Sequence, residues 1–256
     1  MGWLLALDPL LEGGIGLAEV LIVLLKTVVA FTLLLVSVIL MVWFERKVIG
    51  DLQNRIGPNK AGPWGLLQTL ADGLKLILKE DIVPDAADRW MFKLAPFLSV
   101  VPAFVTFAVV PLGGAFDGDD TGTIELFGHE TYLQLADPPI GVLLVLAMSS
   151  IAVYGILLAG WSSGSKYPLL GSVRGSAQMV SYEAALALSV VSVVMLSGSL
   201  STHEIVVQQA GTGFEPFGLA WVPGWNILAT GVVPFIVFYI AATAELNRPP
   251  FDLVEA

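Results

Sequence analysis

Four carboxylates in the second half of the chain have surroundings that favour proton exchange. Glu183 interrupts the apolar stretch "SAQMVSYEAALALSVV", and Glu245, Asp252 and Glu255 follow in the closing segment "ELNRPPFDLVEA". Carboxylates that lie close together away from water titrate as coupled groups and can exchange protons near neutral pH. Two plainer interpretations stay open: Glu183 can be a hydrogen-bonded structural residue, and the closing acids can belong to a solvated loop.

A second group of polar residues recurs at helical spacing. Gln68, Asp72, Lys75 and Lys79 follow one another at steps of four, three and four residues and form one stripe, with leucine and isoleucine on the opposite face. The pattern predicts an amphipathic helix over about 64–80, which is too short and too polar to cross a bilayer and lies in the membrane interface. This helix is either a surface anchor or the rim of a lipid-facing cavity with Asp72 and Lys75 at its mouth.

The elements that must position these residues are membrane helices. The chain is 56% hydrophobic and only 13% charged, whereas an ordinary soluble domain is about 25% charged. Apolar runs close to the roughly 20 residues that cross a bilayer recur along it. They predict an all-α integral membrane protein, a single membrane domain over 1–256 built as a bundle of transmembrane helices at about 17–44, 94–112, 140–160, 176–198 and 226–244.

The distribution of Lys and Arg predicts the orientation of this bundle. Apart from Lys26, all of them lie in 45–93, in 161–175 or in the tail, while the other two connections contain none and are acidic. The positive-inside rule then places the N-terminus outside, and the 45–93 loop, the amphipathic helix and the tail on the cytoplasmic side.

The predicted fourth span gives Glu183 a depth in the membrane. If the helix starts near Ser176, Glu183 lies roughly 10 Å below the inner surface, at 1.5 Å per residue. A charged side chain at membrane depth costs about 2.5–3.5 kcal/mol on insertion scales, so such residues face a polar interior and have a function. We therefore expect Glu183 to face a wet interior.

Several kinds of site are excluded by composition. The chain has no cysteine, so it can neither ligate an iron–sulfur cluster nor form a disulfide. Its two histidines, His129 and His203, fall in the predicted outer connections, which leaves no inward pair for haem or metal. A net charge of −10 argues against nucleic acid as a partner. A redox cofactor would belong to another subunit.

Three long segments in order carry a resemblance to a known family. "ERKVIGDLQNRIGPNKAGPWGLLQTLADGLKLILKED", "SVRGSAQMVSYE" and "AELNRPPFDLVEA" resemble the signature segments of the quinone-site membrane subunit of proton-translocating NADH:quinone oxidoreductase, respiratory complex I. This family comprises the mitochondrial subunit 1 and its bacterial counterparts, and the likeness runs from the first span to the last residue.

The resemblance implies roles for named residues. It places Glu45, Arg46, Arg55, Asp72 and Lys75, here called the access residues, around the opening and chamber through which quinone arrives from the bilayer. It places Glu183, Glu245, Asp252 and Glu255, here called the pathway acids, in a polar funnel that carries protons toward antiporter-like subunits. Arg174 and Arg248 occupy the matching basic positions of the cytoplasmic loops.

The resemblance also implies partners and a membrane. The chain would be a subunit of an NADH:quinone reductase that binds quinone as substrate, with membrane lipids and the other complex I subunits around it. FMN and iron–sulfur clusters would lie in partner subunits, and this chain would bind no cofactor. The longer N-terminus and acidic outer loop favour a bacterial plasma membrane over a mitochondrial one.

Two features depart from the family pattern. Family members have about eight spans, so a chain that ends in the loop after the fifth span is expected to be part of a longer subunit. The predicted outer connection 113–139 is long and acidic for the family.

Three other interpretations stay open. The first is the related membrane subunit of an energy-converting hydrogenase or of a dehydrogenase with another electron donor. The second is an independent ion-coupled transporter, in which intramembrane acids are also expected, although the chain shows no internal repeat. The third is a structural scaffold, which leaves Glu183 and the closing acids without a role.

Overall fold

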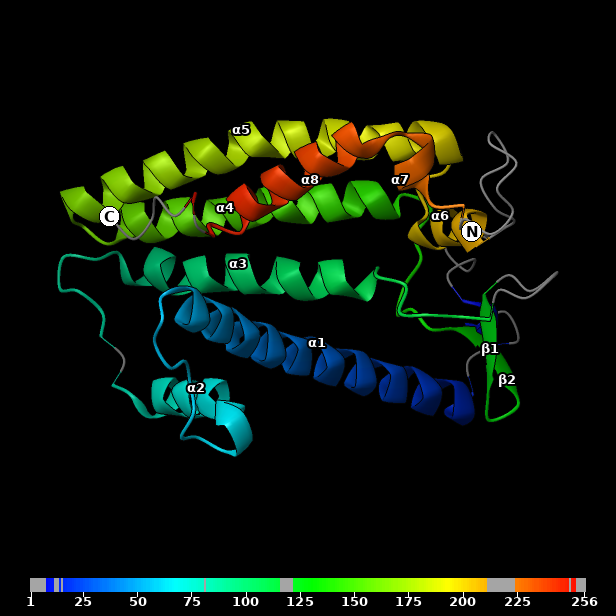
Figure 1. The fold of residues 1–256 in the computed structure, drawn as a ribbon, viewed down its shortest axis with the longest axis horizontal. Coiled ribbons are helices and arrows are strands. Elements are labelled where there is room, and N and C mark those ends of the chain that lie inside the picture. The colour runs from blue at the N-terminus through cyan, green and yellow to red at the C-terminus, as the bar shows by residue number, and fades with distance from the viewer. Residues whose placement is uncertain are drawn as a thin grey trace. The chain divides into compact units, whose positions relative to one another are not determined.

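The computed structural model describes residues 8–11, 14, 16–80, 82–115, 122–210, 224–248 and 250–251, and it is mostly helical (Figure 1). Its backbone contacts divide the chain into two compact units, one formed by Met1–Val23 with Val83–Ala256 and the other by Leu24–Ile82. Each unit is described by itself.

Helix α1 (Leu17–Leu52) begins in the first unit and supplies about half of the second. It continues well beyond the predicted end at residue 44, because "ERKVIGDL" contains no proline and its only glycine, Gly50, is tolerated inside a helix. The helix ends where Asn54 adopts a left-handed φ of 53° ahead of Gly57-Pro58. At 36 residues it is roughly 54 Å long, more than a bilayer needs. Glu45 and Arg46 are therefore helical residues and not loop residues.

Helix α2 (Gln68–Leu78) is the predicted amphipathic helix, shorter at both ends than 64–80. A 3-10 turn at Pro63–Gly65 precedes it, in which Trp64 has a positive φ of 53°. The indole nitrogen of Trp43 on α1 donates a hydrogen bond of 3.1 Å to the carbonyl oxygen of Trp64. This contact ties the turn before α2 to α1 within the second unit.

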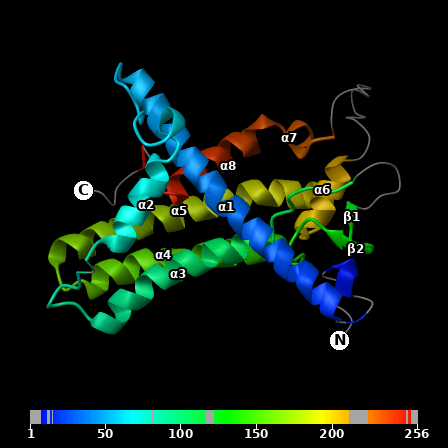
Figure 2. The ribbon, with the colours of Figure 1, turned by 90° about the horizontal axis from the view of Figure 1, so that it is seen from below.

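The first unit is a helix bundle. Helix α3 (Arg89–Ala108) packs on α4 (Gly141–Ser162), α4 packs on α5 (Lys166–Ser197), and α5 packs on α8 (Val232–Glu245). Figures 1 and 2 both show α3, α4 and α5 side by side. A Cβ added at Gly155 of α4 would lie 2.9 Å from the carbonyl oxygen of Ala95 on α3. Small residues thus let the helices approach closely.

Helix α5 begins ten residues before the start assumed from the sequence at Ser176. Pro168 stands in its first turn, where proline is tolerated because the missing N–H has no intrahelical partner there. The stretch 166–175 is therefore helix and not loop. Glu183 therefore lies near the middle of α5 and not two turns from its start, and its depth below the inner surface stays a prediction.

The predicted fifth span is interrupted. Residues 226–244 form two helices, α7 (Asn226–Ala229) and α8, instead of one. Gly231 between them has a φ of 85°, and Pro234 in the first turn of α8 lacks an N–H. In a continuous helix the Pro234 ring would clash with the Thr230 carbonyl group. The prediction of one uninterrupted helix here is wrong, and α8 alone has 14 residues, fewer than the roughly 20 that cross a bilayer.

The acidic connection between α3 and α4 contains the strands of the described chain. Strands β1 (Thr123–Leu126) and β2 (His129–Tyr132) form an antiparallel hairpin around a Phe127-Gly128 turn, in which both residues have positive φ, as a two-residue hairpin turn requires. Buried Thr131 donates to the carboxylate of buried Asp8 at 2.8 Å. The Tyr132 ring lies 4.0 Å from that of buried His203 on α6 (Thr202–Ala210). The described part of this connection is thus folded and tied to α6 and to the residues before α1.

Four described helices, α1, α3, α4 and α5, are long and apolar enough to cross a membrane. Large apolar side chains cover their exposed faces, among them Phe31, Phe97, Leu143 and Leu188. Such surface is unfavourable in water and suits contact with lipid. The protein is therefore a multi-pass membrane protein, as the composition predicts.

Candidate functional site

The first candidate site lies in the second unit, where α1 and α2 meet. Arg46 on α1 donates through Nη1 to Oδ2 of Asp72 on α2 at 2.6 Å. Gln68, one turn earlier on α2, donates to the other carboxylate oxygen at 3.1 Å. Two members of the polar stripe predicted from sequence are therefore joined to each other and to one residue of α1.

The electrostatic state of Asp72 follows from these partners. The hydrogen bond from Arg46 is the largest cause that lowers its pKa, followed by the bond from Gln68, and the charges of Arg46 and Lys75 act in the same direction. Desolvation opposes them but is outweighed by the hydrogen bonds. Asp72 is thus held as a carboxylate at neutral pH.

A pocket of about 450 Å³ opens beside this ion pair, with Arg46 and Arg55 in its wall. Its other lining residues are Ile49, Ile56, Gly57 and Pro58. Arg55 is oriented by a 2.7 Å hydrogen bond from its Nε to the side-chain oxygen of Gln53. Two guanidinium groups beside isoleucine and proline can bind a polar head group that carries an apolar body.

The structure brings together most of the access residues. Arg46 contacts Asp72 and shares the pocket with Arg55. Lys75 is exposed one turn after Asp72, and half-buried Glu45 precedes Arg46 on α1. The role predicted for these residues, around the opening and chamber for quinone, stays a prediction.

The lowered pKa of Asp72 has a testable consequence. Its ordinary value is 3.8, so the contribution of the ion pair to docking of α2 is complete above that pH and is lost as the pH falls through the lower, folded value. We expect Asp72→Asn to increase amide hydrogen exchange in α2 at neutral pH, by a modest amount because the pair is partly exposed. The difference from wild type should vanish in strong acid.

The matched control for this measurement is Asp51→Asn. Asp51 is exposed on the last turn of α1, and its carboxylate makes no hydrogen bond or ion pair within the described residues. Exchange in α2 should not respond to that change. An effect of Asp72→Asn that persists unchanged in strong acid would contradict the role given to the ion pair.

The second candidate site lies in the first unit and joins two pathway acids to one helical turn of α4. The hydroxyl of Ser150 hydrogen-bonds the carboxyl of Glu183 on α5. The hydroxyl of the adjacent Ser149 hydrogen-bonds the carboxyl of Glu245, the last residue of α8. Both acids are only partly buried. The structure thus brings two carboxyls that lie far apart in sequence to adjacent residues of α4.

The serines of this site are functional candidates that sequence reasoning missed. "MSSIAVY" sits inside an apolar run, where a serine usually bonds a backbone carbonyl of its own helix. Nothing in the local pattern distinguishes Ser149 and Ser150 from such residues. Only the packing of α5 and α8 against α4 gives them carboxyl partners.

The segment after α8 is docked on α5 next to Glu183. Asn247 adopts a left-handed φ of 48° and turns the chain. Gln178 on α5 then donates to the carbonyl oxygen of Phe251 at 2.8 Å, and the Phe251 ring packs edge-on at 5.0 Å against Tyr182. The start of the closing segment is thereby anchored one residue from Glu183.

The remaining predicted site residues lie on the surface or outside the described residues. Arg174 is exposed on α5, and Arg248 is exposed just after α8. Two pathway acids, Asp252 and Glu255, lie outside the described residues. Within the described part of the chain, no three His, Cys, Asp or Glu side chains are grouped so that they could hold a metal ion.

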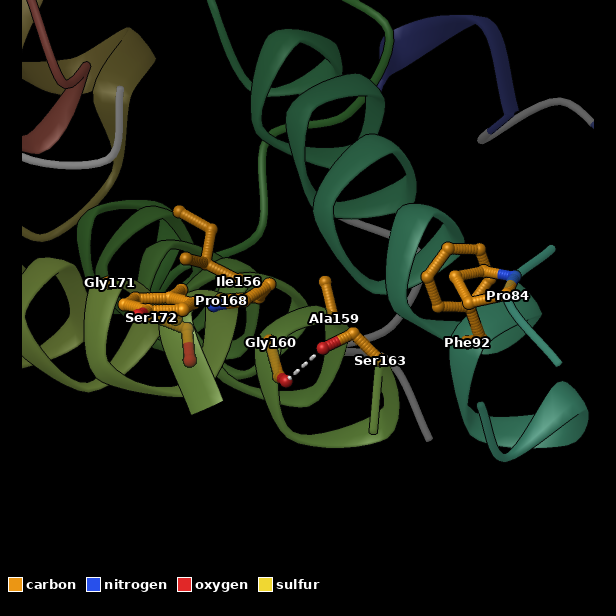
Figure 3. A pocket seen from close by; sticks show the side chains of 10 residues that line it. Pro84, Phe92, Ile156, Ala159, Gly160, Ser163, Pro168, Gly171 and Ser172 are labelled. Atoms are coloured by element: carbon orange, nitrogen blue, oxygen red, sulfur yellow. Dashed lines mark hydrogen bonds between the residues drawn. The ribbon is translucent and has the colours of Figure 1, made fainter. Parts of the chain in front are cut away.

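A second pocket lies among α3, α4 and α5 (Figure 3). This groove of about 640 Å³ is lined mainly by apolar and small residues, including Phe92, Ile156, Ala159, Tyr167 and Pro168. Ser163 in its wall bonds the carbonyl oxygen of Gly160 at 2.7 Å, as Figure 3 shows. Its serine hydroxyls are thus satisfied by nearby backbone carbonyls, and the groove offers no titratable acid.

This chain is similar to known proteins over nearly its whole length. A family model described as NADH dehydrogenase matches residues 25–256. An NADH-quinone oxidoreductase subunit of Frankia alni is 47% identical over 249 residues, which cover 97% of this chain and 50% of the relative. NADH-quinone oxidoreductase subunits of Frankia casuarinae and Streptomyces avermitilis are 47% and 45% identical over 235 residues, 92% of this chain and 47% and 48% of their own lengths. This chain therefore spans about half the length of these relatives.

Proposed function

The chain belongs to the NADH dehydrogenase family, and we propose that it acts as a membrane subunit of a proton-translocating NADH:quinone oxidoreductase. In this proposal it forms the quinone access and part of the quinone chamber, and it links quinone reduction to proton translocation. The observation that carries the proposal is the identity of 45–47%, over more than nine-tenths of the chain, with relatives named as NADH-quinone oxidoreductase subunits.

The access residues have the chemistry to receive a quinone. A quinone head group has two carbonyl oxygens that accept hydrogen bonds, and an isoprenoid tail that needs apolar surroundings. The pocket beside α1 supplies guanidinium donors from Arg46 and Arg55 next to Ile49 and Ile56. Asp72, kept ionised by Arg46, fixes the orientation of that arginine at the mouth of the pocket.

The pathway acids have the chemistry to carry protons away from the chamber. Reduction of quinone to quinol takes up two electrons and two protons, so charge that appears in a poorly solvated chamber changes the protonation of nearby carboxylates. Glu183 and Glu245 meet at one turn of α4, and Asp252 and Glu255 would continue the path. Arg174, exposed on α5, and Arg248, just after α8, serve as basic residues on the same side.

The same proposal names partners and location. The redox cofactors, FMN and iron–sulfur clusters, reside in partner subunits, because this chain has no cysteine to hold a cluster. The partners are the other complex subunits: the peripheral ones that carry the terminal cluster, small membrane subunits and antiporter-like subunits. The chain sits in a bacterial plasma membrane with its N-terminus outside and α2 on the cytoplasmic side.

The test is quinone-dependent oxidation of NADH by membranes that carry the full-length subunit with Asp72→Ala. We expect a loss of about tenfold, the scale of losing one hydrogen bond to a charged group, because the substitution leaves the Arg46 guanidinium without its anchor. Oxidation by an artificial acceptor, which reports the peripheral arm alone, should not change.

Asp51→Ala is the matched control, since it removes an exposed acid from the same unit without touching Arg46. This change should leave NADH oxidation by quinone and by the artificial acceptor at the wild-type rates. If Asp72→Ala also leaves both rates unchanged, the access assignment is wrong and the transporter and scaffold interpretations return.

A further inference from the structure

Two neighbouring serines on α4 contact acids from two different helices. Ser149 bonds Glu245 of α8, and Ser150 bonds Glu183 of α5. Successive residues of an α-helix point about 100° apart, so a Ser-Ser pair can face two neighbouring helices at one level. One turn of α4 thus holds both carboxyls at the same level of the bundle.

These serines differ from most of the serines on α5. Ser181, Ser189, Ser192 and Ser197 on α5 donate to carbonyl oxygens three or four residues earlier in that helix, at 2.6–2.9 Å. That is the usual way a serine satisfies its hydroxyl in an apolar helix. Ser149 and Ser150 hydrogen-bond titratable groups on other helices.

Ser150 has a second hydrogen bond, of 3.1 Å, with the carbonyl oxygen of Leu146. A hydroxyl has one proton to donate and two lone pairs that accept. An ionised Glu183 can only accept, so Ser150 must then donate to it. A protonated Glu183 can donate to Ser150, and the serine proton is then free to turn to the Leu146 carbonyl. Ser150 therefore has a satisfied hydrogen bond in both protonation states.

We propose that Ser149 and Ser150 are positioning residues that hold the Glu245 and Glu183 carboxyls at one turn of α4, and that Ser150 reverses its hydrogen bond whenever Glu183 gains or loses a proton. This rests on the proposed function of the two acids in proton transfer. No proton passes through the serine: the proton that Glu183 takes up stays on its carboxyl, and the serine hydroxyl only rotates toward Leu146.

The test uses the complete oxidoreductase in its native membrane with Ser150→Ala and Ser150→Thr. We expect Ser150→Ala to lower coupled quinone reduction and proton pumping by about tenfold, the effect of losing one hydrogen bond to a charged group. Ser150→Thr keeps the hydroxyl and should restore most of the rate. Ser192→Ala, which removes a serine bonded only to its own helix, should change neither rate.

A second readout separates positioning from packing. Redox-induced infrared difference spectra report the carboxyl stretch of Glu183, which is assigned by its disappearance in Glu183→Gln. Ser150→Ala should shift this band, Ser150→Thr should retain it, and Ser192→Ala should leave it unmoved. Each rate is divided by the amount of assembled complex, which corrects for variants that assemble poorly. Ser150→Cys has only a weak S–H donor and should behave like the alanine variant.

Two results would overturn the proposal. One is a Ser150→Ala variant with the wild-type rate and an unshifted band, and the other is a loss that threonine does not rescue. The Glu183→Gln variant distinguishes a failure of the positioning role of Ser150 from a failure of the proposed function. Coupled turnover that survives Glu183→Gln removes the acid itself from the mechanism, whereas an inactive Glu183→Gln beside a normal Ser150→Ala rejects only the role of the serine.

Discussion

Replacing Glu183 by glutamine in the complete oxidoreductase is expected to lower quinone-dependent NADH oxidation and proton pumping by roughly a hundredfold, since removal of a positioned proton-transfer group typically costs about 10²- to 10⁴-fold. Glutamine matches glutamate in size and can still accept the hydrogen bond of Ser150, so packing of α4 on α5 should survive. What it loses is the ability to bind and release a proton. Reduction of the iron–sulfur clusters of the peripheral arm by NADH should be unaffected.

The control for this prediction is Glu204→Gln. Glu204 is also hydrogen-bonded by a serine, Ser199, but it is exposed on the short helix α6. The substitution changes the same chemical group away from the proposed pathway and should leave both rates at the wild-type level. Normal coupled turnover in Glu183→Gln would exclude Glu183 from the proton path.

Replacing Gly160 by alanine is expected to destabilise the subunit by about 1–3 kcal/mol, the usual cost of overpacking. A Cβ at this position of α4 would lie 2.5 Å from the carbonyl oxygen of Pro168 on α5 and would collide with the Ser172 side chain. Backbone atoms cannot rotate away as a flexible side chain can. Helices α4 and α5 would have to separate, which also displaces Ser150 from Glu183.

Gly171→Ala is the matched control for this change. Gly171 lies on α5, beside the same groove, yet a Cβ there would meet no atom within 4 Å. Alanine at this site should be neutral or stabilise the helix by up to about 1 kcal/mol. The measurement is the fraction of assembled complex that survives heating in mild detergent. Equal survival of the two variants would contradict the close approach of the helices.

Much of the fold follows from local patterns. The apolar runs predict the four membrane helices α1, α3, α4 and α5, and the polar stripe around Asp72 predicts α2, because burial in lipid and amphipathic periodicity are properties of consecutive residues. The ends are less certain. The predicted start of α5 at Ser176 is wrong, because the helix begins at Lys166 and holds Pro168 in its first turn, where proline is tolerated.

The break in the fifth predicted span shows a different limit. Gly231 and Pro234 stand in "GVVPFIVFYI", where each alone is acceptable in a membrane helix. Here Gly231 adopts a left-handed φ and Pro234 follows three residues later, and the two together separate α7 from α8. Whether such a pair kinks or breaks a helix depends on which groups satisfy the freed Thr230 carbonyl, and those groups come from tertiary packing.

For the candidate sites, the sequence by itself determined which groups are titratable. It placed Asp72 and Glu183 on predicted helices, whereas Arg46, expected in a loop, stands on α1. The sequence made Glu183 conspicuous because charge inside an apolar stretch is costly, and its resemblance to the family implied the roles of Arg46, Asp72 and Glu245. It did not determine that Arg46 pairs with Asp72, or that Ser149 and Ser150 join Glu245 and Glu183. Those contacts depend on how helices distant in sequence pack side by side. A serine hydroxyl in a helix can always bond a backbone carbonyl of its own helix, so only the packed structure shows that these two serines bond carboxyls.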